Sequence, residues 1–302
     1  MAADRPLLGI LLMLGFCVLA PVGDALAKII GQTVPLGILL LVRFAVQALI
    51  LIPIVLVAKR KWRMSKRVQR LAWLRTLLHI IGIGAMFTAL RFLPLADAVA
   101  IAFVMPFIML VLGHYVLGEE IGIRRIIACA VGFAGTLLVI QPAFDTVGWP
   151  ALLPLVVAVV FSLFMLVTRQ IAKETDPITL QAVNGVMAVI ILTPLMVLFG
   201  KTGLDLFALA IPNGTEAFML FSIGVLGTLA HLLMTWSLRF APSATLAPMQ
   251  YLEIPFATFI GWLIFSELPN GLASVGIAIT ISAGLYIILR ERAINAKSPT
   301  AH

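Results

Sequence analysis

The chain has 302 residues, of which 62% are hydrophobic and 11% are charged, and its formal net charge at pH 7 is +8. So few charged residues cannot solvate the surface of a soluble domain of this length. Apolar stretches of roughly 20 residues, the length that crosses a bilayer, recur along the whole chain. The composition therefore predicts a polytopic integral membrane protein and excludes a soluble globular one.

The first apolar stretch also resembles a secretory signal. Arg5 precedes an apolar run at residues 7–20, and small residues follow at 25–27. We interpret this stretch as a retained membrane helix, because an equivalent segment occurs in the middle of the chain. The two cysteines, Cys17 and Cys129, both lie in apolar runs, so neither a disulfide nor a metal site is expected.

Turn residues and charges interrupt the apolar pattern and predict ten membrane helices. In chain order these cover residues 7–28, 35–57, 71–90, 95–117, 122–140, 149–171, 177–199, 216–238, 244–266 and 271–289. Several of them contain proline, which membrane helices tolerate where neighbouring helices shield the freed carbonyl groups. The predicted fold class is an all-α membrane protein with ten transmembrane helices.

The ten predicted helices form two halves that repeat each other. The motif "LRFLP" at 90–94 recurs as "LRFAP" at 238–242, an offset of 148 residues. The same offset aligns Met86 with Met234 and Glu119 with Glu267, and an offset of 141 aligns Lys28 with Arg169 and Arg43 with Asn184. We therefore predict two five-helix repeats, residues 1–143 and 144–302. Because five is odd, the second repeat should be inverted in the membrane, as in many secondary transporters.

The positive charges predict the orientation. If both termini are cytoplasmic, most of the 21 lysines and arginines lie on the inner side, and only Lys28, Arg91 and Lys201 lie on the outer side. This bias explains the net charge without a nucleic-acid partner. The basic segment 59–75 is interpreted as an inner loop that acts as a topology signal, although such a segment could also contact anionic lipid. The expected location is the bacterial inner membrane.

Four of these charges lie at the ends of the predicted helices. We hypothesise that Arg91 pairs with Glu267 on the outer side and Arg239 with Glu119 on the inner side, as two links between the halves. The alternative is that each charge sits at the membrane surface without a fixed partner.

Two long segments carry a resemblance to a known family. They are "LRFLPLADAVAIAFVMPFIMLVLGHYVLGEE" (90–120) and "LRFAPSATLAPMQYLEIPFATFIGWLIFSE" (238–267). With the ten helices and the repeat, they resemble the drug/metabolite transporter superfamily in its EamA branch. The resemblance implies transport of a small organic metabolite, and the chain looks similar to bacterial riboflavin importers with ten helices. Pro255 lies one position later than the family's usual Glu-Pro, which leaves the helix break in the ninth helix open.

Two charged residues lie deep inside predicted helices. Glu253 lies near the middle of the ninth helix, where a carboxyl group marks a transport pathway or a proton site, or else bonds the carbonyls freed by nearby prolines. A buried carboxyl is readily neutralised by a proton, which would suit a proton-coupled carrier. Arg43 lies inside the second helix and either holds an acceptor group of the cargo or pairs with Asp24, Asp97 or Glu253.

Further residues are candidates for lining a central cavity, because aromatic faces and amides suit a planar or amphipathic solute. They are Phe103, Gln47, Asn184, Trp236, Gln250, Tyr251, His79 and His231. Ordinary packing is the alternative for each. For two acidic residues we expect structural roles: Asp24 pairs with Lys28 one helical turn away, and Asp97 caps a helix.

The predicted function is a secondary carrier that works by alternating access, with riboflavin uptake as the specific hypothesis. The alternatives are an exporter of amino acids, S-adenosylmethionine or other amphipathic metabolites, a pore, and an intramembrane enzyme. No nucleophile with a base, no metal-ligand spacing and no nucleotide loop supports an enzyme, so no cofactor or metal is expected. The partners are the small-molecule cargo and the lipid bilayer, with proton coupling as a hypothesis and either a monomer or a homodimer as the assembly.

Overall fold

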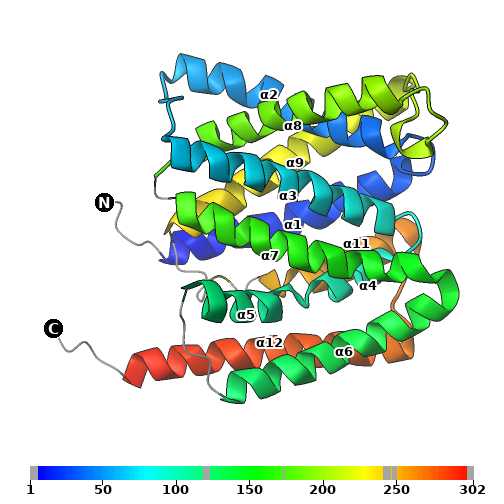
Figure 1. Cartoon of the computed structure of the whole chain (residues 1–302). Coiled ribbons are helices and arrows are strands. Elements are labelled where there is room, and N and C mark those ends of the chain that lie inside the picture. Colours follow the sequence, from blue (N-terminus) through cyan, green and yellow to red (C-terminus); the bar gives the residue numbers. More distant parts are fainter. Residues whose placement is uncertain (1–5, 118–122, 173, 241–245, 247–249, 298–302) are drawn as a thin grey trace.

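The structure is a computed structural model that describes residues 6–117, 123–172, 174–240, 246 and 250–297. Within these ranges it contains helices and no strand, in agreement with the predicted all-α class (Figure 1). The α-helices are α1 (Pro6–Ile30), α2 (Leu36–Val57), α3 (Lys66–Ala89), α4 (Leu95–Ala102), α5 (Met105–Leu117), α6 (Ile123–Val147), α7 (Leu153–Ile171), α8 (Pro177–Phe199), α9 (Gly214–Phe240), α11 (Glu253–Phe265) and α12 (Gly271–Lys297). Two short 3-10 helices, η1 (Trp149–Leu152) and η2 (Asp205–Phe207), complete the described elements.

Seven helical stretches in the described ranges are long and apolar enough to cross a membrane. They lie in α1, α2, α3, α6, η1 with α7, α8 and α9. The predicted fourth helix, 95–117, is instead two helices, α4 and α5, which meet at Phe103 and Val104. Pro106 explains this break, because it has no N–H for the carbonyl four residues earlier and is tolerated only in the first turn of α5.

The helices of the two halves pack in matching pairs. If α1, α2, α3, α4–α5 and α6 are matched in order with α7, α8, α9, α11 and α12, the packing of α1 on α9 corresponds to that of α7 on α3. The pairs α2–α8, α4–α11 and α6–α12 each map onto themselves. In Figure 1 each helix of the second half runs antiparallel to its counterpart in the first.

The bundle has two distinct ends. The start of α1 and the end of α12 lie at one of them (Figure 1), where Arg60 pairs with Asp176, and Arg67 pairs with Glu174 at 2.5 Å. We call this the basic end. The connections 31–35 and 91–94 lie at the other end, which we call the opposite end.

One detail of the predicted basic segment 59–75 is wrong. The helix α3 already begins at Lys66, so the second half of this segment is helical and not a loop. Ser65 caps that start, since its side chain accepts a hydrogen bond from the N–H of Val68 at 3.2 Å. Arg75 therefore lies more than two turns inside α3, and its side chain is fully buried.

Candidate substrate site

A cavity of about 100 Å³ lies between α1, α2, α3, α4, α7 and α9. Its walls are mostly apolar, and four ionisable side chains reach it: Asp24, Arg43, His231 and Glu253. The aromatic residues on its wall are Phe16, Phe87, Phe103 and Phe161. A largely apolar wall with a few polar groups is typical of a ligand site, although this cavity is smaller than the usual volume of about 300 Å³ or more.

Arg43 reaches the cavity from the middle of α2, and only 2% of the residue is exposed. Its Nη2 lies 3.3 Å from Nδ1 of His231, and its guanidinium carbon lies 4.8 Å from the ring centroid of Phe44. Among the described residues Nη1 has no hydrogen-bond partner. Arg43 therefore has donor capacity left for an acceptor group of the cargo.

His231 connects Arg43 to the backbone of α9. Its Nδ1 also lies 2.9 Å from the carbonyl oxygen of Gly227, so this nitrogen either donates to the carbonyl or accepts from Arg43, depending on the tautomer. Gly227 makes the arrangement sterically possible, because a Cβ atom there would lie 2.9 Å from Nε of Arg43.

A larger side chain at Gly227 should therefore displace the arginine. We expect Gly227→Ala to lower substrate transport about tenfold, equivalent to roughly 1.4 kcal/mol, while the protein still inserts and folds. Gly23→Ala is the matched control, since Gly23 also lines the cavity and its added Cβ would meet nothing closer than 3.9 Å. The loss would be measured as substrate uptake divided by the amount of protein inserted in the membrane. Equal losses of uptake in the two variants would contradict the steric argument.

Two carboxyl groups, Asp24 on α1 and Glu253 at the start of α11, reach the same cavity as Arg43. Asp24 and Arg43 are close enough to attract each other electrostatically. The expected pair of Asp24 with Lys28 is wrong, because Lys28 bonds to another carboxylate. The cavity thus offers acceptors from its carboxyl groups and donors from its arginine.

A polar layer lies behind Arg43. Gln47 donates from Nε2 to the carbonyl oxygen of Gln181 at 2.7 Å, and Asn184 donates from Nδ2 to the hydroxyl of Thr76 at 2.8 Å. Nδ1 of His79 lies 2.8 Å from Oδ1 of Asn184. Three predicted cavity residues, Gln47, Asn184 and His79, therefore support the site from behind and do not line the cavity in this conformation.

Three other predicted lining residues also lie outside the cavity wall. The ring centroid of Tyr251 lies 5.4 Å from that of Phe103, which does line the cavity, and Gln250 is buried with its Nε2 3.9 Å from the sulfur of Met13. Trp236 packs on the apolar cluster between α2 and α8. For Trp236 the packing alternative therefore holds in this conformation.

Arg75 is a buried polar residue that the sequence did not mark as a site residue, because it lies where the predicted basic segment 59–75 overlaps the predicted helix 71–90. Its Nε donates to the hydroxyl of Thr168 at 2.8 Å, and its guanidinium carbon lies 4.4 Å from the ring centroid of Phe164. Its two terminal nitrogens have no partner among the described residues. The available signal was the spacing of four residues to His79, which places both side chains on one face of α3.

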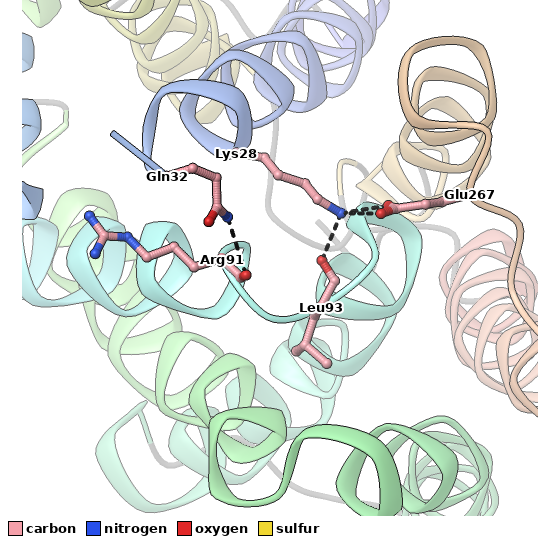
Figure 2. Close-up of polar contacts among 5 residues, drawn as sticks. All are labelled: Lys28, Gln32, Arg91, Leu93 and Glu267. Atoms are coloured by element: carbon pink, nitrogen blue, oxygen red, sulfur yellow. Dashed lines mark hydrogen bonds and ion pairs between the residues drawn. The ribbon is translucent and has the colours of Figure 1, made fainter. Parts of the chain in front are cut away.

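At the opposite end, Lys28 ties together three segments (Figure 2). Its Nζ lies 2.5 Å from Oε2 of Glu267 and donates to the carbonyl oxygen of Leu93 at 3.0 Å. Arg91 points away from Glu267 and donates to the carbonyl oxygen of Val34 at 3.0 Å. The expected Arg91–Glu267 pair is therefore wrong, because the carboxylate of Glu267 pairs with Lys28 of α1.

The remaining charge predictions have mixed outcomes. The second expected link joins Arg239 to Glu119, and Glu119 lies outside the described residues. Asp97 is in the first turn of α4, but its Oδ1 is buried and has no hydrogen-bond partner among the residues that the structure describes, so the expected capping role is wrong for that oxygen.

The Lys28–Glu267 pair predicts a charge-swap result. Lys28→Glu or Glu267→Lys alone should lower transport several-fold, because each places two like charges side by side. The double variant should recover at least half of the lost activity. Arg67→Glu with Glu174→Arg, an exposed pair at the basic end, serves as the control swap. Failure of the double variant to exceed both single variants would show that the pair has no role.

Comparisons with known proteins agree with a multi-pass membrane transporter. Residues 7–141 and residues 148–290 each match the model of the EamA-like transporter family. The chain belongs to this family.

Several curated relatives are transporters of named metabolites. The chain is 31% identical to a riboflavin transporter of Rhizobium johnstonii over 72% of this chain and 69% of that one. It is 26% identical to a riboflavin transporter of Vibrio cholerae over 82% and 80% of the two chains. It is 24% identical to an S-adenosylmethionine uptake transporter of Rickettsia felis over 89% and 88%. A solved crystal structure with 18% identity shares the fold, with a TM-score of 0.65 over 95% of this chain and 98% of that one.

Proposed function

We propose that this protein is a secondary carrier that takes up riboflavin across the bacterial inner membrane. The observation that carries the proposal is the cavity, where one arginine, one histidine and two carboxyl groups face phenylalanine rings. The relatives named riboflavin transporters support the choice of cargo. Riboflavin has a flat aromatic ring system with carbonyl groups, a ring N–H and a hydroxylated side chain, so it offers a partner to every kind of group on this wall.

In this proposal each polar group has a defined partner. Arg43 and His231 donate to the ring carbonyls, and Asp24 and Glu253 accept from the ring N–H or the hydroxyl groups. The rings of Phe103 and the other aromatic residues pack on the flat face of the ring system. These buried donors should discriminate strongly against a riboflavin analogue that lacks the ring carbonyl groups, because such an analogue would leave the donors without a hydrogen-bond partner.

The proposed architecture has ten crossings in two inverted repeats, residues 1–143 and 144–302. The mapped helix packing and the antiparallel counterparts support it. We place the basic end in the cytoplasm, with both termini, because positive charges are retained on that side. In this proposal one copy of the chain forms a complete transport unit, whether the protein is a monomer or a homodimer.

We include proton coupling in the proposal. Glu253 and Asp24 are two cavity carboxyl groups that repel each other when both are charged. A proton that enters with the cargo removes this repulsion. Transport would then be driven by the proton gradient, since nothing in the sequence predicts a nucleotide site.

The second candidate cargo is S-adenosylmethionine, and the same two carboxyl groups favour it because they would bind its positive charges. Uptake assays in a riboflavin-auxotrophic bacterium without its own importer distinguish the two. We expect expression of the protein to support growth on low riboflavin, with saturable uptake that excess S-adenosylmethionine leaves unchanged. Uptake of S-adenosylmethionine without riboflavin uptake would transfer the proposal to the second cargo, and neither uptake would overturn both.

A further inference from the structure

The cavity is displaced toward the opposite end of the bundle. On α3 it is lined by residues between Gly82 and Phe87, near the end of that helix at Ala89. On α7, which runs the other way, it is lined by Val157, Ala158 and Phe161, near the start of that helix at Leu153. In the conformation of this structure, the cavity therefore lies nearer to the opposite end than to the basic end.

The repeat register assigns each of these residues a counterpart. Near the middle of the bundle both members of a pair line the cavity, as Ile83 and His231 do at the offset of 148. Farther from the middle only one member lines it. The lining residues Ile223, Gly227, Ala102 and Phe103 correspond to Arg75, His79, Gln250 and Tyr251, and at the offset of 141 Gly23 and Arg43 correspond to Phe164 and Asn184.

Four of these counterparts, Arg75, His79, Phe164 and Asn184, already lie in a connected, buried layer on the side of the basic end, and Gln250 and Tyr251 are also buried. The ring of His79 lies 4.8 Å from Phe164, which packs on Arg75, and His79 contacts Asn184. The ring of His79 also lies 4.4 Å from that of His231, which lines the present cavity. Through this pair of histidine rings the layer is in direct contact with the wall of the present cavity.

We propose that Arg75, His79, Phe164, Asn184, Gln250 and Tyr251 form a second binding face, which lines the cavity when the site is open to the basic end. The inference rests on the carrier function proposed above. In an inverted repeat, the two halves exchange conformations when the site changes sides, so each residue takes the place that its counterpart held. All six residues are polar or aromatic groups able to form hydrogen bonds or to pack on a ring.

The chemistry of this face selects acceptor oxygens. Both terminal nitrogens of Arg75 and the Nε2 of His79 are fully buried and have no partner among the described residues. An arginine fork binds two acceptor oxygens at once, as on a carboxylate, or on the carbonyl groups of a flavin. A buried guanidinium that pairs with no carboxylate is costly to keep, which is consistent with a ligand that offers acceptors during the transport cycle.

Matched cysteine variants test the side from which each face is accessible. Met86 lines the cavity, and its counterpart Met234 is 0% exposed and does not. In a background with Cys17→Ser and Cys129→Ser, we expect a membrane-impermeant thiol reagent to modify Met86→Cys from the periplasmic side and Met234→Cys from the cytoplasmic side, each at least about tenfold faster than from the other side. Thr235→Cys, whose counterpart Phe87 lines the cavity, is a second and smaller change if Met234→Cys does not fold.

Modification of both Met234→Cys and Thr235→Cys from the periplasmic side, or from neither side, would overturn the inference. The labelling needs no cargo, so it stands apart from the choice of riboflavin: absent riboflavin uptake with side-specific labelling would overturn only the proposed cargo.

The role of Arg75 can be tested separately, by the KM for riboflavin at each face of the membrane. We expect Arg75→Gln to raise the KM for riboflavin at the cytoplasmic face about tenfold, measured in inside-out vesicles, and to change the KM at the periplasmic face less than about twofold. Arg75→Lys should recover part of the loss, because it restores the charge without the fork. Equal changes at both faces would mean a purely structural arginine.

Discussion

Arg43→Gln will lower riboflavin uptake by about 10- to 100-fold, the effect of losing charge-assisted hydrogen bonds of about 1.5–3 kcal/mol. The glutamine keeps a donor of similar polarity but loses the charge and the second terminal nitrogen that faces the cavity. In the described part of the chain Arg43 has no carboxylate partner within ion-pair distance, so the substitution breaks no direct ion pair and weakens only the longer-range attraction of Asp24; it should not prevent folding.

The control for this prediction is Arg67→Gln, which removes an exposed arginine at the basic end of the bundle. It should leave uptake within about twofold of the unmodified protein, since exposed ion pairs contribute little. Uptake would be measured with labelled riboflavin and divided by the amount of protein in the membrane. Unchanged uptake in Arg43→Gln would remove Arg43 from the site.

Glu253→Gln will uncouple riboflavin transport from the proton gradient. The amide has the shape of the protonated carboxyl but cannot release a proton, so the site stays in its neutral form. We expect uptake by the unmodified protein to rise when the outside is made mildly acidic, because protons then enter down their gradient with the cargo. The variant should exchange riboflavin across the membrane but lose this pH response and the ability to accumulate it.

Glu174→Gln is the matched control, because Glu174 is a carboxylate in an exposed pair at the basic end. It should keep the full pH response. A Glu253→Gln protein that still accumulates riboflavin in response to an acidic exterior would assign the proton to another group, and Asp24 would be the next to test.

Much of the fold follows from local sequence patterns. Some helix boundaries were predictable because apolar runs and turn residues are adjacent in the chain, as at residues 36–57 and 177–199, whereas the start of α3 and the ends of α6 and α12 lie five or more residues from the predicted positions. The offset between "LRFLP" and "LRFAP" predicted the matched halves. The break between α4 and α5 was missed, although Pro106 was visible, because a proline inside a membrane helix does not always interrupt it.

The site was less predictable because its contacts join distant helices. Arg43, Glu253, Phe103 and His231 do line the cavity, since a polar or aromatic side chain inside an apolar helix tends to face a cavity. Asp24 was assigned to Lys28 by spacing along one helix, whereas Glu267 from a remote segment takes that lysine. Spacing within a helix restricts which residues share a face but does not decide which remote partner arrives there.

The same limit explains Arg75. A cluster of basic residues at 59–75 has the composition of a loop, and composition does not show where a helix starts. Only the packing of α3 on α7 places Arg75 against Phe164 and Thr168.

In the proposed mechanism the cavity between the two halves carries riboflavin by changing sides. Counterflow in proteoliposomes tests it most directly, with the purified protein and unlabelled riboflavin trapped inside. We expect internal riboflavin to accelerate the entry of external labelled riboflavin to a transient excess, with saturation, and Arg43→Gln to abolish the effect. Entry that rises linearly with concentration and ignores the internal riboflavin would contradict a carrier.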